Sequence, residues 1–206
     1  MDEEVELMAT PSAISATTES VIRLLRSSYN PADFNNASLD FQVYVANDFL
    51  TPMDEGVSLL LYRIYHDGTN RNPPGRLQPD GQRGRNKLPL ELHFMLTAWA
   101  KQASLQHEIA GWMMRTLEDN PVLYPSLLNS YKPDVFFPEE TVELSLAQLS
   151  VEDMFNIWDV IIHHVYQLSV PYVARVVELE STLAEAEGIS IQERILDFRQ
   201  PVLTNG

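Results

Sequence analysis

The sequence contains no cysteine. This absence excludes disulfide bonds, thiolate metal sites and cysteine nucleophiles, and it fits a protein that does not depend on an oxidising compartment. The sequence also lacks any apolar run near the roughly 18 residues of a membrane span. Its first six residues are mostly acidic and include no apolar run, so we expect no secretory signal peptide. Disulfide-stapled secreted scaffolds and membrane-spanning proteins are therefore not expected.

Basic residues are scarce, with 14 lysines and arginines against 29 acidic residues and a formal net charge of −15. Such a charge disfavours nonspecific binding of the bulk surface to nucleic acid or anionic membranes. The chain of 206 residues is 45% hydrophobic, which is enough for one substantial core. We therefore expect an acidic leader over 1–13, a single domain over 14–180 and a C-terminal extension over 181–206.

Two apolar, aromatic-rich runs over 56–65 and 88–99 form the centre of the predicted fold. Both are bounded by turn residues, as is typical of strands. Leu59 and Leu60 lie on opposite faces of the first run, and both are apolar. Strands covered on both sides show this pattern, so we expect helices on at least one face of a sheet with these strands as its central pair.

The remaining periodicities predict an α+β domain with a mostly antiparallel, four- to five-stranded sheet packed against helices on one face. Ser12 or Ser15, Ser104 and Ser150 are the expected helix N-caps. The stretch over 121–138 has four prolines and is expected to be an irregular connection. Helices are predicted over 12–29, 102–119 and 150–166, and further strands over 39–46, 141–146 and 172–179.

The loop between the two central strands is long, has no apolar periodicity and carries five cations against a single acid, Asp80. Structureless loops above about 12 to 15 residues are usually functional or disordered. The cations allow contact with phosphate, but the loop lacks the interleaved aromatics of single-strand binders. Contact with an acidic neighbouring subunit is the favoured interpretation. The predicted protein-interaction residues are Arg71, Arg76, Arg83, Arg85 and Lys87.

One helix offers a candidate metal pair, Asp159 and His163, at i and i+4 spacing. His164 points about 100° away from His163 on a helix, and no third ligand follows at a recognisable spacing. We therefore expect no metal site.

No catalytic or cofactor-binding residue is predicted either. His93 lies between Leu92 and Phe94, where a hydrogen-bonded core role is more common than catalysis. We expect it and Glu91 to pair across the strands with Arg63 or Tyr65. The sequence contains neither the Gly-x-Ser-x-Gly motif of a serine nucleophile nor a complete phosphate-binding loop. The protein is accordingly expected not to be an enzyme.

A set of spaced segments resembles the tail-terminator or cap family of phage-tail-like contractile injection systems, over about 14–180. The extended connection between Tyr124 and Pro138 departs from the simplest family form. The resembling segments are Gly56–Ile64, Asn70–Asn72, Leu90–Trp99, Leu117–Leu123, Leu144–Leu146, Ile157–Trp158 and Leu168–Val177.

The resemblance implies a structural protein with a phage tail-terminator-like fold. Such a protein forms a hexameric ring on the distal end of the inner tube, ends tube growth and anchors the last sheath layer. Its implied partners are further copies of itself, the tube protein and the sheath protein, without membrane, nucleic acid or cofactor. Assembly is expected in the cytoplasm, followed by incorporation into a particle that can be released. The alternatives are a nucleic-acid-associated head-to-tail connector component, marked by salt-dependent DNA retention, and a small hydrolase, marked by metal-dependent turnover.

Overall fold

The computed structural model describes residues 11–68, 87–161 and 166–180. Four of the predicted interaction residues, Arg71, Arg76, Arg83 and Arg85, lie outside the described residues. His163 and His164, most of the predicted leader and the whole predicted extension over 181–206 lie outside them as well.

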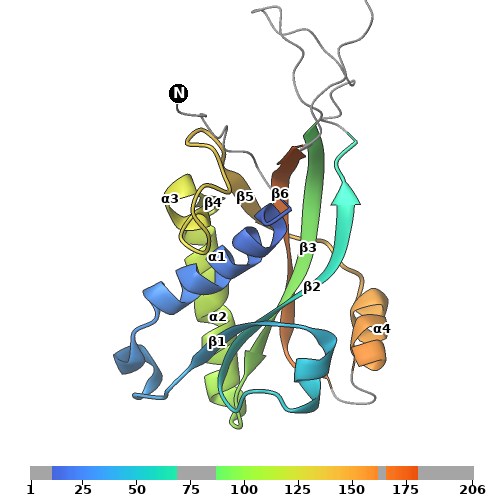
Figure 1. Cartoon of the computed structure of the whole chain (residues 1–206). Helices are drawn as coiled ribbons and strands as arrows, with labels where there is room; N and C mark the ends of the chain where they lie inside the picture. The colour runs from blue at the N-terminus through green and yellow to red at the C-terminus, as the bar shows by residue number, and fades with distance from the viewer. Residues whose placement is uncertain (1–10, 69–86, 162–165, 181–206) are drawn as a thin grey trace, which may run out of the picture.

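The domain is an α+β fold built on one sheet with the strand order β1-β2-β3-β6-β5-β4 (Figure 1). The α+β class is confirmed. The sheet has six strands, whereas four to five were expected. β1 runs parallel to β2, and every other pair of neighbours is antiparallel. The elements in chain order are α1 (Ala13–Ser28), η1 (Pro31–Phe34), β1 (Asp40–Tyr44), η2 (Ala46–Leu50), β2 (Gly56–His66), β3 (Lys87–Trp99), α2 (Ala103–Asp119), β4 (Val122–Leu123), α3 (Pro125–Leu128), β5 (Val142–Leu146), α4 (Val151–Ile161) and β6 (Ser169–Glu180).

The predicted pair of long strands is confirmed as β2 and β3, which pair in antiparallel register from Gly56 opposite Trp99 to His66 opposite Leu90. The pair is not the exact centre of the sheet, because β6 lies on the other side of β3. β1 pairs with β2 only as far as Leu60. The outer edge of β2 beyond Leu60 therefore has no strand neighbour within the described part of the chain.

Gly56 fixes the place where β1 and β2 begin to pair. Its φ is +146°, and a Cβ atom added there would lie 2.0 Å from the carbonyl oxygen of Asp40. Glycine alone tolerates both this backbone conformation and so close an approach of the neighbouring strand. The residue thus allows a parallel edge strand to be added to an otherwise antiparallel sheet.

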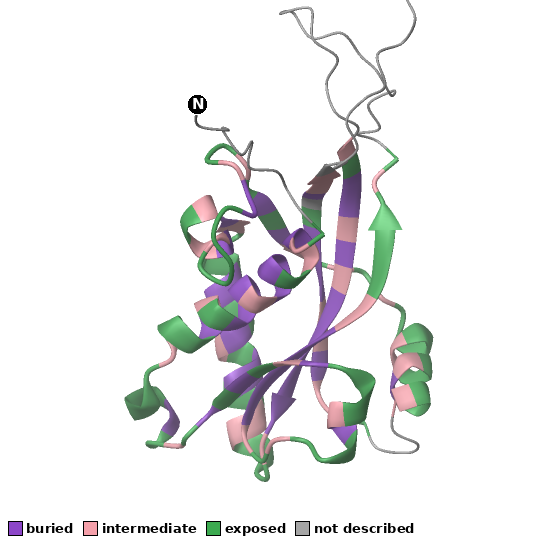
Figure 2. Cartoon of the chain, in the orientation of Figure 1, coloured by how far each residue is buried: buried purple, intermediate pink, exposed green. Residues whose placement is uncertain are grey.

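Helices cover both faces of the sheet, which corrects the expectation of helices on one face. Leu59 of β2 and Phe94 of β3 belong to a large core under α1 and α2. The next residues, Leu60 and Met95, point to the opposite face because side chains alternate along a strand. There they join a smaller cluster under η2 and α4. Figure 2 shows that β3 is mostly buried, with intermediate residues in its first half, and that α4 is mostly exposed.

The helix ends agree with the expected caps only in part. Ser150 accepts a hydrogen bond from the backbone N–H of Asp153 over 3.0 Å, as predicted for the start of α4. Ser12 occupies the N-cap of α1 without a side-chain cap bond. The N-cap of α2 is Gln102, and the predicted cap Ser104 lies inside the helix. Both helices nevertheless begin within two residues of their predicted starts.

Candidate interaction surface

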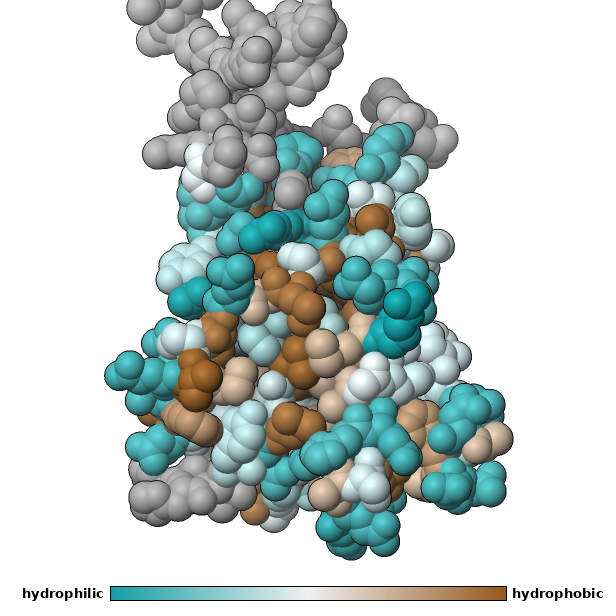
Figure 3. All heavy atoms as spheres, turned by 180° about the vertical axis from the view of Figure 1, so that it is seen from behind, coloured by the Kyte–Doolittle hydropathy of each residue, from teal (hydrophilic) through white to brown (hydrophobic). Residues whose placement is uncertain are grey.

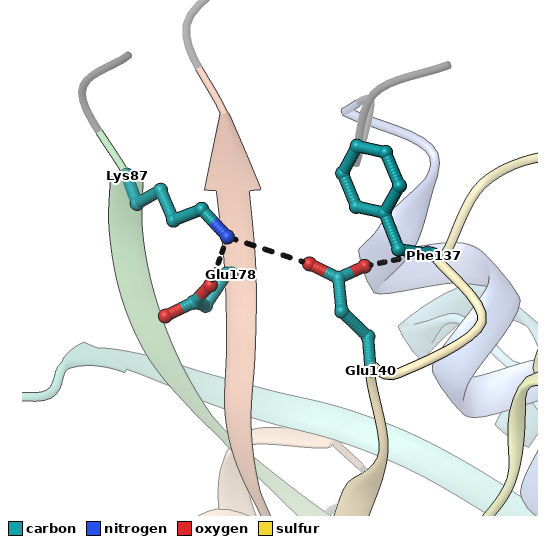
Figure 4. A network of polar contacts seen from close by, with 4 residues as sticks. All are labelled: Lys87, Phe137, Glu140 and Glu178. Carbon is teal, nitrogen blue, oxygen red and sulfur yellow. Dashed lines mark hydrogen bonds and ion pairs between the residues drawn. The ribbon is translucent and has the colours of Figure 1, made fainter. Parts of the chain in front are cut away.

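Lys87 is the one predicted interaction residue that the structure describes, and it begins β3. Its ammonium group lies 2.8 Å from a carboxylate oxygen of Glu178 on β6 and 3.7 Å from one of Glu140 (Figure 4). The other oxygen of Glu140 accepts the backbone N–H of Phe137 over 2.8 Å. Lys87 thus ties β3, β6 and the turn before β5 together. The intermolecular role of the basic loop remains a prediction.

A chain of polar and aromatic contacts crosses β2, β3 and β6. The Arg63 guanidinium lies 4.1 Å from the Tyr65 ring centroid, and the Tyr65 and His93 rings lie 5.4 Å apart. Glu91 reaches His93 over 3.4 Å and Arg175 over 3.1 Å. The predicted contact of His93 with Tyr65 is therefore confirmed, whereas the ion pair of Glu91 is made with Arg175 and not with Arg63.

The contacts that link Arg63, Tyr65, His93, Glu91 and Arg175 resemble the packing of a protein surface more than a catalytic site. Burial lowers the pKa of His93, and its hydrogen bond with Glu91 opposes that effect only in part. The neutral imidazole can accept a proton, but the carboxylate that would stabilise the resulting imidazolium is already paired with Arg175. The arrangement offers aromatic rings, a cation and hydrogen-bond donors to a partner molecule.

The candidate metal pair is only half described. Asp159 belongs to α4, and His163 lies outside the described residues. In the described ranges no three histidine or acidic side chains lie close enough together to hold a metal ion. The expectation that the pair binds no metal remains a prediction.

Helix α4 is attached to the sheet through one fully buried residue, Trp158. Its ring lies 5.5 Å from that of Phe49 on η2 and 6.4 Å from that of Trp99 on β3. Val151 and Val160 of the same helix are 70% and 84% exposed. An amphipathic helix on a sheet normally turns such residues inward. α4 therefore presents apolar side chains in more than one direction.

A groove of about 560 Å³ runs between α4 and β2. It is mostly apolar, with the guanidinium of Arg63 and the carboxylate of Asp153 among its polar groups. Figure 3, which views the molecule from behind Figure 1, shows apolar side chains in the middle of that face, bordered by hydrophilic ones. Exposed apolar patches of this kind mark interaction sites. We define the α4 surface as Ile157, Val160 and Ile161, the apolar residues of α4 that line this groove.

The α4 surface was not predicted from the sequence. The helical stripe pointed to Met154, Ile157, Trp158 and Ile161 as the buried side, and only Trp158 is fully buried. The signal that could have revealed it is Val160, which lies about 160° around the helix from Trp158 and therefore off that stripe.

Comparison with solved structures finds the same fold in two assemblies. The chain is 16% identical to a sheath/tube terminator of PVC, an extracellular contractile injection system, with a TM-score of 0.56. The match covers 93% of this chain and 65% of the terminator chain. It is also 13% identical to the tube-terminating cap of the anti-feeding prophage, with a TM-score of 0.55. That match covers 86% of this chain and 60% of the cap chain. The chain therefore spans less than two thirds of either protein.

Sequence comparison assigns the family. No curated protein matches the chain. No helix within the described ranges has the length and apolarity required to cross a membrane. The model of the Pvc16 N-terminal domain matches residues 16–193, which is most of the sequence, and the chain therefore belongs to the Pvc16 N-terminal domain family.

Proposed function

We propose that this protein is a terminator of a contractile injection particle, in which six copies form a ring on the end of the inner tube and anchor the last sheath layer. The observation that carries the proposal is the family match over residues 16–193. The similarity in fold to a sheath/tube terminator and to a tube-terminating cap supports it.

The physical requirement for such a protein is simple. A tube built from identical head-to-tail contacts grows without limit unless something occupies its end. A ring with matching rotational symmetry can occupy every site of the last tube layer at once. Its protomer needs surfaces for its neighbours and for the tube, and the structure offers more than one surface with exposed apolar or charged groups.

The basic loop is the proposed contact with an acidic neighbour. The loop sequence has almost no apolar residues, so neutralising Arg71, Arg76, Arg83 and Arg85 should leave the domain folded. A charge pair that assembly removes from water is costly to break, on the order of 2 to 5 kcal/mol when one partner is lost. Lys87 is kept in this variant because its ion pairs with Glu178 and Glu140 belong to the domain itself.

The experiment replaces these four arginines with serine and measures the length of tubes in purified particles by electron microscopy. We expect a folded protein that fails to cap and yields overlong or ragged tubes. The matched control replaces Lys101 and Arg115, two cations outside the loop that are largely exposed. Tubes of normal length with the loop variant would show that the loop is not a docking element.

A second measurement separates the terminator from a connector that contacts nucleic acid. The protein should not be retained on DNA at physiological salt, given its net charge of −15. Strong retention that falls steeply with salt, and that is lost in the loop variant, would instead assign the loop to a nucleic-acid backbone.

A further inference from the structure

The molecule carries two different exposed surfaces at opposite edges of its sheet. α4 lies beside β2, near one edge, and α3 follows β4 at the other edge (Figure 1). A ring joined head to tail needs two such surfaces on each protomer, because the surface that one copy offers must fit a different surface of the next.

The α4 surface is apolar and flanked by acids. Val160 is 84% exposed, and Ile157 and Ile161 line the groove beside it. Glu152 is exposed in the first turn of the helix. Apolar anchors with a charged rim are the composition of protein interfaces.

The opposite edge is aromatic and basic. Tyr124 and Tyr131, on either side of α3, are 62% and 48% exposed. Two cations are fixed beside them by hydrogen bonds: Arg23 donates to the carbonyl of Ser130 over 2.9 Å, and Lys132 donates to the hydroxyl of Ser12 over 3.0 Å. We define the α3 surface as Tyr124, Tyr131, Arg23 and Lys132. Tyrosine and arginine are the residues most often found at binding hot spots.

We propose that the α4 surface of one copy docks on the α3 surface of the next. The occupant is a second copy because the charges are complementary, acids beside α4 facing cations beside α3, and because the two surfaces lie at opposite edges of one protomer. Tyrosine rings pack on the apolar residues of α4 and enter the groove between α4 and β2. The inference rests on the proposed ring and names the contact that closes it.

The absence of cysteine makes a direct test possible, since the chain has no thiols other than those introduced. The full chain carrying Val160→Cys and Tyr124→Cys is treated with a short bismaleimide at particle ends or in the assembled ring. A head-to-tail contact yields a ladder of linked chains up to the closed ring. Each single variant should yield no linked chains, and linked dimers from Val160→Cys alone would overturn the proposal, because they show α4 against α4.

Substitutions give a second and independent readout. Val160→Glu should weaken ring formation at least tenfold without altering folding, because it places a charge at the centre of the contact. The matched control is Met114→Glu, an exposed apolar residue on α2 outside both surfaces, which should have no effect. Glu152→Lys and Lys132→Glu should each weaken assembly about threefold, and the combined variant should recover it.

The outcomes separate this inference from the proposed function. If rings cap particles normally but the cysteine pair does not link and Val160→Glu has no effect, the α4 contact is wrong and the terminator role stands. If Val160→Glu abolishes capping while the cysteine pair never links, the α4 surface belongs to another partner, which also overturns the inference. If the unmodified protein is absent from particle ends, the terminator role itself fails.

Discussion

The two faces of the sheet are covered in different ways. On one face α1 and α2 share a continuous core with the strands, and half of the residues of α1 are buried. On the other face α4 contributes a single buried residue, Trp158, to a small aromatic cluster. α1 and α4 both have an apolar stripe, but only the stripe of α1 is buried within the described part of the chain.

This difference separates what stabilises the domain from what is available to a partner. Burying apolar surface contributes about 25 cal/mol per Å², so the first face supplies most of the folding free energy. The apolar residues that α4 exposes contribute little to the isolated chain. Their contribution is expected on assembly, when a second surface removes them from water.

The largest expected effect is on the first face. Phe94→Ala removes a fully buried ring that stacks on Tyr172 at 6.0 Å. The free energy of unfolding should fall by about 3 to 5 kcal/mol, as for other buried aromatic residues. Denaturant unfolding followed by circular dichroism measures it, and a loss below about 1 kcal/mol would mean that the core under α1 and α2 does not carry the fold.

A smaller effect is expected where α4 meets the sheet. Trp158→Ala should cost about 2 kcal/mol, less than Phe94→Ala, because the cluster around it is small and lies at the margin of the sheet. Amide protons of α4 should then exchange faster, while those of α1 and α2 keep their protection. A uniform loss of protection would show that the two faces are one cooperative unit.

Exposed residues of α4 should matter to assembly and not to folding. Val160→Ser changes a side chain that is 84% exposed, so the unfolding free energy should shift by less than about 0.5 kcal/mol. The same variant should reduce the fraction of capped particles. A substantial loss of stability in the isolated chain would contradict the contrast between the two helices.

The smallest expected effect is on pH dependence. Because burial lowers the pKa of His93, the unfolded state binds the proton more readily than the folded state. The stability contributed by the neutral imidazole is therefore present above the ordinary pKa of 6.5 and declines as the pH falls below it. His93→Gln should unfold with a shallower pH dependence between pH 7 and 5, measured by thermal melts across that range. Identical profiles would place His93 in solvent.

Long periodic elements could be predicted from the sequence, and short or context-dependent ones could not. α1, α2, β2 and β3 lie close to their predicted ranges because their apolar residues repeat over three turns or more, or over a full strand. β4 was missed because two residues between Pro121 and Tyr124 carry no period. Its pairing with Val142 and Glu143 is visible only in three dimensions.

Other features depend on contacts between distant parts of the chain. The apolar alternation of Leu59 and Leu60 indicated a strand covered on both faces, but it did not say that α4 would reach the second face. The parallel pairing of β1 follows from the approach that Gly56 permits, which the sequence alone does not show. The predicted terminator family came from the spaced segments and is confirmed, whereas the α4 surface needed the structure.

Imaging the end of the particle tests the central claim most directly. Particles assembled with the chain carrying a small density tag should be averaged at the tube end by cryo-electron microscopy. The account predicts one ring of six copies on the last tube layer, with α4 of each copy facing α3 of the next. An end without the tag, or a purified chain that remains strictly monomeric and absent from particles, would contradict it.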